Sequence, residues 1–175
     1  MRPVRNKSRS TPSEPPGAKL DPDGEKGFTA ARLAAVALLG RRDFASTELR
    51  DKLSAQGFAA DHVEQVVAEL IAGKIVDDAR YAENYVAHHA ERGQGPERIG
   101  AALKALDLPE SLIEDALAAG PDWRQRAREV RIRRFGLEEP ETDAQRAKQG
   151  RFLQYRGFSS DHIRAALGPD FDLDA

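Results

Sequence analysis

The clearest chemical signal in this sequence is a run of arginines in its last third. Residues 123–136 contain six arginines and a single acid. Arg124, Arg128 and Arg131 follow an i, i+4, i+7 spacing, which on a helix places three guanidinium groups on one stripe. Such a stripe favours contact with phosphates or with an acidic protein surface, although an ordinary solvated helix face gives the same pattern. The predicted polyanion-binding set is Arg124, Arg128, Arg131, Arg133, Arg134, Arg151 and Arg156.

Other residue types that could do chemistry do not converge. His88 and His89 are neighbours, so on a helix they point about 100° apart and cannot hold one ion. His62 and His162 lie near expected helix starts and lack an i, i+4 partner. There are no cysteines, and no glycine-rich phosphate loop or hydrolase signature is present. We therefore expect no enzyme activity, no metal and no cofactor.

Composition limits how the chain could bind nucleic acid. The 175 residues carry a formal net charge of -2, and the isoelectric point is near 6.1. A uniformly basic surface is excluded, so any binding must come from a local patch. The longest apolar run, residues 33–39, is far short of a membrane span, and the proline-rich N-terminus lacks a signal-peptide core. We expect a cytoplasmic protein, and a monomer.

A repeat of about fifty residues organises the chain from Phe28 onward. Apolar residues occupy matching positions in three successive units, except that Gln149 is polar where the other two units have an apolar residue. Within each unit the apolar spacing is helical, with no alternation typical of strands. The matched positions are Leu49, Leu53, Phe58, Val63 and Val67, then Ile99, Leu103, Leu108, Ile113 and Leu117, then Leu153, Phe158, Ile163 and Leu167.

Each unit is predicted to contain three helices. Gly40 and Gly57 are expected to end helices in the left-handed conformation, and Ser46 is expected to be an N-cap. Asp77 and Asp78 most simply favour the positive end of a helix that follows them. The expected helices are 29–39, 46–56, 60–72, 78–91, one opening at Pro96, one opening at Pro109, 122–134, 142–155 and 159–167.

The predicted architecture is therefore all-α, with three tandem three-helix repeats in an elongated array. Small modules of this size are marginal alone and gain stability by stacking on their neighbours. The N-terminal segment contains five prolines and few large apolar residues, so we expect it to be disordered. The predicted parts are a tail at 1–27, repeats at 28–76, 77–120 and 121–168, and an acidic C-terminal tail at 169–175.

Three segments carry a resemblance to a known family. They are E-L…L…G-F at 48–58, D-D-A-R-Y-A at 77–82 and F-L-Q-Y-R-G-F at 152–158. In this order and spacing the chain resembles RecX, the bacterial family that regulates the RecA recombinase, over about residues 31–167. One departure is Asp107, where the family commonly turns through glycine; Asp tolerates the left-handed conformation better than most residues, so we expect the turn to survive.

The resemblance implies tandem three-helix repeats that bind the groove of the RecA–single-stranded-DNA filament. It also implies inhibition of RecA's ATPase, strand-exchange and coprotease activities. Two other functions remain open on the residues alone. Residues 46–70 could form a helix-turn-helix that binds specific duplex DNA, although a threefold repeat does not need one recognition helix. The array could also be a helical scaffold that binds only proteins.

Overall fold

The computed structural model describes residues 22–168, and this part of the chain is nine helices without a strand. The all-α prediction is confirmed. Most predicted helix bounds agree to within one residue, because capping residues and turn residues mark the ends locally. The helices are α1 Pro22–Leu39, α2 Ser46–Ala55, α3 Ala60–Ala72, α4 Asp78–Glu91, α5 Pro96–Lys104, α6 Glu110–Ala118, α7 Trp123–Phe135, α8 Asp143–Tyr155 and α9 Ser160–Leu167.

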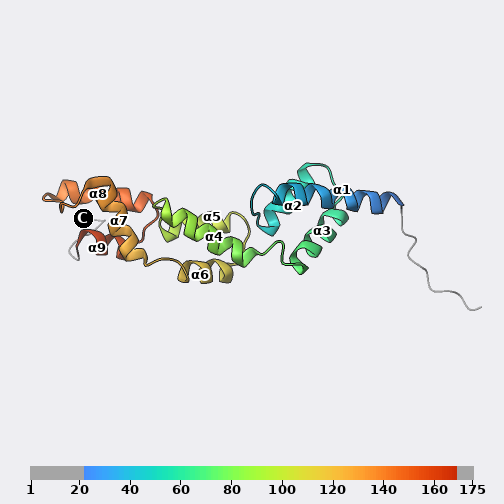
Figure 1. Ribbon diagram of the computed structural model, residues 1–175. Coiled ribbons are helices and arrows are strands. Elements are labelled where there is room, and N and C mark those ends of the chain that lie inside the picture. Colours follow the sequence, from blue (N-terminus) through green and yellow to red (C-terminus); the bar gives the residue numbers. More distant parts are fainter. Residues whose placement is uncertain (1–21, 169–175) are drawn as a thin grey trace, which may run out of the picture.

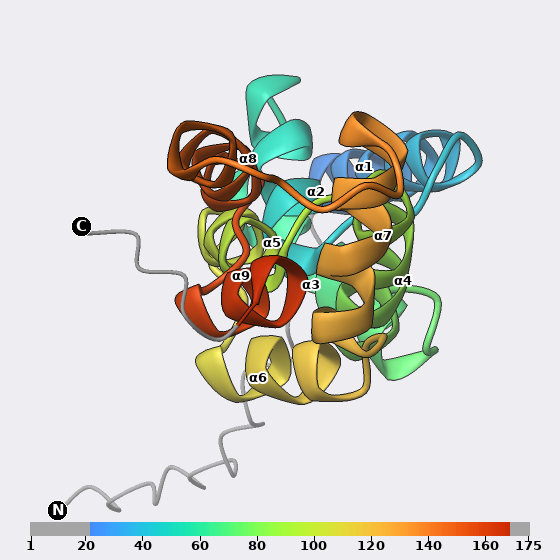
Figure 2. The same ribbon diagram turned by 90° about the vertical axis from the view of Figure 1, so that its left-hand side faces the viewer.

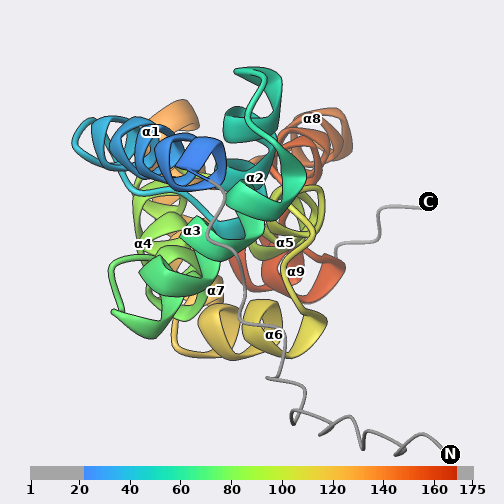
Figure 3. The same cartoon turned by 90° about the vertical axis from the view of Figure 1, so that its right-hand side faces the viewer.

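The nine helices form three triplets that lie end to end (Figure 1). Viewed along the long axis from either end, the triplets project within one compact outline (Figures 2 and 3). In every helix pair that packs closely, both helices belong to one and the same triplet. The body is therefore an elongated array of three repeats, as predicted. Residues 1–21 and 169–175, where the two tails were predicted, lie outside the described part of the chain.

The first helix begins earlier than predicted. The sequence suggested a helix from residue 29 after a tail ending at 27, but α1 starts at Pro22. A proline blocks a helix from continuing through it, yet at the first helical position its missing N–H group costs nothing. Residues 22–27 are therefore helical, and this part of the predicted tail is wrong.

Side-chain caps begin several of the later helices. Asp77, Asp122, Thr142 and Ser159 each accept a hydrogen bond from a backbone N–H in the first turn of the helix that follows. The prediction that Ser46 is an N-cap is wrong: the N-cap of α2 is Ala45, which makes no side-chain bond.

The turn between the second and third helices of each repeat needs a left-handed residue. Gly57 and Gly157 both have φ of 89°, and Asp107 at the equivalent place has φ of 54°. The prediction that this turn survives through Asp107 is confirmed. Gly40, at the end of α1, was also predicted to be left-handed, and this prediction is wrong because Gly40 does not have a positive φ.

Each repeat has its own apolar core, and the fifty-residue series supplies much of it. Leu49 and Ile99 are fully buried at the first position of the series, and Leu53, Leu103 and Leu153 at the second. The third core, around Val130, Leu153, Phe158 and Ile163, has fewer buried members than the other two. Ala45 crosses the boundary: it belongs to the first repeat but is buried in the second core.

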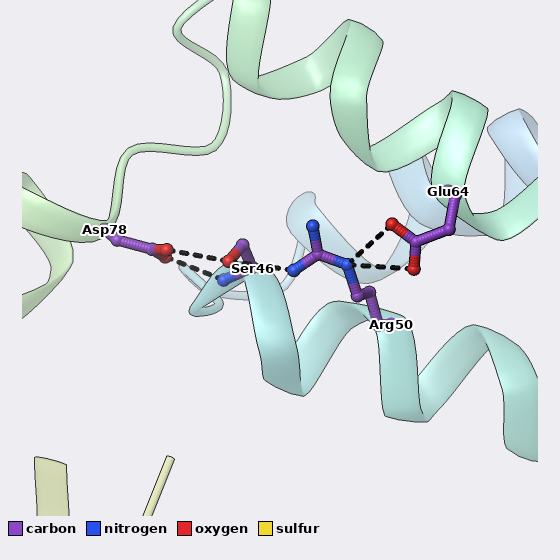
Figure 4. A network of polar contacts seen from close by, with 4 residues as sticks. All are labelled: Ser46, Arg50, Glu64 and Asp78. Atoms are coloured by element: carbon purple, nitrogen blue, oxygen red, sulfur yellow. Dashed lines mark hydrogen bonds and ion pairs between the residues drawn. The ribbon is translucent and has the colours of Figure 1, made fainter. Parts of the chain in front are cut away.

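A polar network joins the first and second repeats (Figure 4). The Asp78 carboxylate, at the start of α4, accepts hydrogen bonds of 2.7 Å from both the backbone N–H and the hydroxyl of Ser46 on α2. Arg50 donates to the Ser46 hydroxyl at 3.2 Å and pairs with Glu64 on α3 at 3.1 Å. Asp78 thus binds the free end of a helix in the preceding repeat, whereas Asp77 caps its own helix.

The second joint is made by backbone against backbone. Gly95 N–H donates to the Arg156 carbonyl at 2.8 Å, and Glu97 N–H donates to the Gly157 carbonyl at 3.0 Å. A Cβ on Gly95 would lie 2.2 Å from the Gly157 oxygen, and a Cβ on Gly157 would lie 2.4 Å from the Arg98 Cβ. Both glycines are needed for the two repeats to approach this closely.

Candidate nucleic-acid interface

The structure separates the seven predicted arginines into several places. They do not form one stripe. Arg156 is half-buried at the end of α8, and Arg131 is buried in the third repeat. The exposed members are Arg124, Arg128, Arg133, Arg134 and Arg151.

Arg131 does not belong to the exposed surface. Its residue exposure is 6 %, and its guanidinium donates to the Glu138 carbonyl at 3.0 Å and to Gln149 Oε1 at 3.4 Å. Gln149 occupies the place of Leu49 and Ile99, so the break in the repeat is explained: a polar side chain there accepts from a buried arginine. The predicted i, i+4, i+7 stripe therefore loses one of its three members.

Arg124 and Arg128 lie on the side of α7 that faces α9. Arg128 Nε donates to the Ala165 carbonyl at 2.7 Å, near the end of α9. The pKa of His162, at the start of α9, is lowered by burial and then by the charge of Arg124. His162 Nδ1 accepts a hydrogen bond of 3.3 Å from the Ser159 N–H, which completes a capping box. His162 is thus a structural group.

Three predicted arginines meet a fourth at a cleft between the second and third repeats. Arg133 and Arg134 come from the end of α7 and Arg156 from the end of α8. Arg92, which follows α4, is the fourth arginine in the lining. Sequence reasoning missed Arg92 because it lies in an acidic part of the chain, and no local signal indicates that it joins the basic last third. The cleft has a volume of about 110 Å³ and its lining residues are Arg92, Gly93, Val130, Arg133, Arg134, Phe152 and Arg156.

Two phenylalanines orient part of this cleft. The Arg156 guanidinium carbon lies 5.3 Å from the ring centre of Phe152, and that of Arg134 lies 5.7 Å from the ring centre of Phe135. The two rings meet edge to face with centres 5.3 Å apart. Cation–π contacts of this kind favour a fixed guanidinium position over a freely solvated one. Arg156 also donates to the Arg92 carbonyl at 3.3 Å.

Ion pairing differs between the two ends of the array. In the first repeat, Arg32 pairs with Glu69 and Arg42 with Glu48, and Arg50 pairs with Glu64 as described above. In the third repeat, pairs are formed by Arg126 and Arg164. Within residues 22–168, no ion pair is formed by Arg92, Arg124, Arg128, Arg133, Arg134, Arg151 or Arg156. Cationic groups available to an external polyanion are thus concentrated toward the third repeat.

One aromatic side chain stands out on the surface near the second joint. Tyr155 is 76 % exposed, and the Arg98 guanidinium carbon lies 5.5 Å from its ring centre. Arg98 also donates to the Tyr155 carbonyl at 3.3 Å. Tyr155 is therefore an exposed aromatic side chain that lies beside Arg98 at the second joint.

Metal binding and membrane insertion receive no support from the described residues. In the described part of the chain, no three His, Asp or Glu side chains are grouped closely enough to hold a metal ion. None of the helices in residues 22–168 has the length and apolar character needed to span a membrane.

A larger cleft of about 540 Å³ lies between α5 and α6, with Leu108 and Ile113 in its lining and the carboxylates of Glu97, Glu110 and Glu114 around it. Its acidic lining does not suit a polyanion.

Comparison with protein families gives three matches, one for each triplet of helices. Residues 31–70 match the family described as "RecX, first three-helix domain". Residues 77–117 match "RecX, second three-helix domain" and residues 122–167 match "RecX, third three-helix domain". Together the matches cover most of the chain, in the order in which the repeats occur.

Individual relatives agree with these matches. The chain is 40 % identical over 138 residues to a "Regulatory protein RecX" of Halorhodospira halophila, covering 78 % of this chain and 86 % of that one. It is 37 % identical over 137 residues to the protein of the same name from Vibrio vulnificus, covering 78 % and 90 %. A solved RecX structure from Lactobacillus salivarius superposes with a TM-score of 0.73 at 22 % identity, over 86 % of this chain and 98 % of that one, which supports the fold. The chain therefore belongs to the RecX family of regulatory proteins.

Proposed function

We propose that this protein regulates a RecA recombinase by lying lengthwise in the groove of the RecA–single-stranded-DNA filament. In this position it inhibits the ATPase, strand-exchange and coprotease activities of RecA. Membership of the RecX family makes a regulatory role the starting point. The contacts with the filament, with its DNA and with RecA itself are the proposal.

One observation carries this proposal: within residues 22–168, arginines that form no ion pair are concentrated toward one end of an elongated array. A filament presents both protein and phosphate along its length, so a partner with separated charge is suited to a composite surface. Within residues 22–168, eight of the twelve arginines that form no ion pair belong to the third repeat, whereas three arginines of the first repeat are neutralised by glutamates. Arg131 is left out of the proposed surface because it is buried.

Several weak contacts made by one body act at a high effective concentration, so the whole array binds more tightly than any single repeat. The two joints described above hold the repeats in register, which lets one molecule touch neighbouring RecA protomers at once. Contact across protomers then opposes the subunit movements that ATP turnover and strand exchange require. Inhibition follows without removal of RecA from DNA.

The test is RecA ATPase on single-stranded DNA with the full-length protein titrated in. We expect inhibition at amounts well below those needed to coat the DNA. Inhibition that begins only when free single-stranded DNA is saturated would favour simple competition for DNA, and no inhibition at all would contradict the proposal.

A matched pair of variants locates the contact. Arg124→Glu with Arg151→Glu reverses two exposed charges in the third repeat, and Arg41→Glu with Lys52→Glu does the same in the first. Because both doubles change the net charge equally, only the position differs. We expect the third-repeat double to need several times more protein for half-inhibition than the first-repeat double. Equal inhibition by the two doubles would show that the third repeat has no special role.

A further inference from the structure

We propose that the four-arginine cleft between the second and third repeats is a binding site for a phosphodiester group of single-stranded DNA. The site consists of Arg92, Arg133, Arg134 and Arg156 around Gly93 and Phe152. It deepens the proposed function and rests on it, because the single-stranded DNA that would occupy this site is the strand held in the RecA filament. The inference adds a specific place, a ligand group and a residue, Arg92, from the second repeat.

The charge of the cleft is the first step of the argument. Four arginines line about 110 Å³, and within residues 22–168 no acidic residue lines the cleft. None of the four forms an ion pair within the described residues. Like charges gathered in one concave place raise the local positive potential, which an anion relieves. The small volume suits a phosphate group rather than a whole nucleotide.

The chemistry of the lining is the second step. Arginine presents a planar fork of donors that matches the oxygens of a phosphate, and it keeps its charge at any physiological pH. Arg134 and Arg156 are already oriented by the rings of Phe135 and Phe152. Less side-chain freedom is therefore lost when these two groups bind an anion than when free surface arginines do.

The backbone around the cleft is the third step. Gly93 has φ of 78°, and a Cβ placed on it would lie 3.2 Å from Val130 Cγ2 and 4.0 Å from Arg156 Nη1. A side chain at this position would enter the space beside the guanidinium. Arg156 is in turn held by its bond to the Arg92 carbonyl, and the Gly95–Gly157 contact lies next along the chain. The site exists only where the two repeats meet in this register.

The test measures single-stranded DNA binding without RecA, by fluorescence anisotropy of labelled oligothymidylate over a range of salt. Arg92→Gln with Arg133→Gln removes two exposed charges of the cleft; apart from a 3.5 Å contact between Arg92 and His88, neither side chain makes a hydrogen bond within residues 22–168. Arg41→Gln with Lys52→Gln is the matched control, with the same loss of charge in the first repeat. Both doubles should melt at the same temperature as the original protein within a few degrees.

We expect the cleft double to lower the salt slope of log K by about 0.7, the value for one phosphate contact on a single strand. At about 50 mM salt this corresponds to roughly a tenfold loss of affinity, while the control changes much less. Arg92→Lys with Arg133→Lys should restore the salt slope but only part of the affinity, because lysine lacks the donor fork. A cleft double that binds like the control overturns the inference.

Other ligands distinguish the source of the anion. An oligothymidylate with methylphosphonate links, which lacks the backbone charge, should bind the original protein and the cleft double equally weakly. Inorganic phosphate should compete only at much higher concentration than the oligonucleotide. If oligoglutamate binding depends on the cleft and oligothymidylate binding does not, the partner is an acidic protein segment and the inference is wrong. If the cleft double binds like the control while the original protein still inhibits RecA ATPase, the cleft inference fails alone and the proposed function stands.

Discussion

At the scale of single residues, the buried pair of Arg131 and Gln149 replaces an apolar contact of the other repeats. Among the described residues Arg131 Nε has no hydrogen-bond partner, and Arg131 Nη1 donates both to Gln149 Oε1 and to the Glu138 carbonyl. A buried charge that is incompletely paired lowers the free energy of unfolding, whereas the leucine or isoleucine at the equivalent position of the other repeats raises it. This pair therefore makes the third core less stable than it could be.

Replacing the pair together should cost less than replacing either residue alone. Gln149→Leu removes an acceptor from a buried guanidinium and should lower the free energy of unfolding by about 1.5–3 kcal/mol. Arg131→Met with Gln149→Leu removes both polar groups, so we expect near-neutral or improved stability. Urea denaturation of the two single variants and the double measures this coupling. Additive losses in the double would contradict it.

The capping box of α9 should make stability depend on pH through His162. Burial and Arg124 lower the pKa of His162 below 6.5, so the unfolded chain binds its proton more readily than the folded one. The contribution is complete above about pH 6.5 and is lost as pH falls through the folded pKa. His162→Gln keeps a capping side chain that does not titrate.

We therefore expect His162→Gln to lose less stability than the original protein when the pH is lowered from about 7.5 to 5.5. The measurement is the urea midpoint of both proteins at each pH. His62→Gln, at the equivalent place in the first repeat, controls for the substitution itself. Parallel pH profiles for the original protein and His162→Gln would exclude this role.

At the scale of helices and turns, the glycine between the second and third helices has different structural roles in the first and third repeats. Gly57 and Gly157 share φ of 89°, but a Cβ on Gly57 would meet no atom of residues 22–168 within 4 Å. At Gly157 it would meet the backbone of Arg98, with the nitrogen at 2.6 Å and the Cα at 3.0 Å. One glycine only ends a helix, while the other also lets two repeats come together.

This difference can be measured with one substitution at two places. Gly57→Ala should cost about 1–2 kcal/mol, the usual strain of a left-handed alanine. Gly157→Ala carries the same strain and also pushes the second joint apart, so we expect a clearly larger loss in thermal unfolding. Because both variants carry the same backbone strain, the difference between their losses of stability measures the contribution of the second joint. Equal losses would mean that the joint adjusts without cost.

At the scale of the whole molecule, the array consists of three cores connected by narrow joints. The first joint relies on Asp78 and Ser46, and the second on backbone bonds at Gly95 and Gly157. Across the second joint, Trp123 also packs against the second core and donates to the Leu117 carbonyl at 3.1 Å. Arrays of this kind are stabilised by each repeat and by its contacts with its neighbours.

A chain ended after Gly120 should therefore keep its first two repeats folded. We expect the helical signal per residue in circular dichroism to be retained and the melting temperature to fall by several degrees, because the Trp123 contact is lost. The same truncation should abolish binding at the arginine cleft, which needs α7 and α8. A truncated chain without helical signal would show that the first two repeats depend on the third for folding.

The sequence by itself determined the helices, the three repeats and the family, because these depend on local periodicity, capping residues and motifs. Asp107 could be placed in a left-handed turn because the resemblance to RecX implies a glycine turn there and Asp tolerates that conformation. Side-chain environments were decided by the tertiary structure. The burial of Arg131 depends on its packing against α8, and the meeting of Arg92 with Arg133 and Arg156 depends on a joint between repeats. Helical spacing states which residues share a face, but it does not state what covers that face.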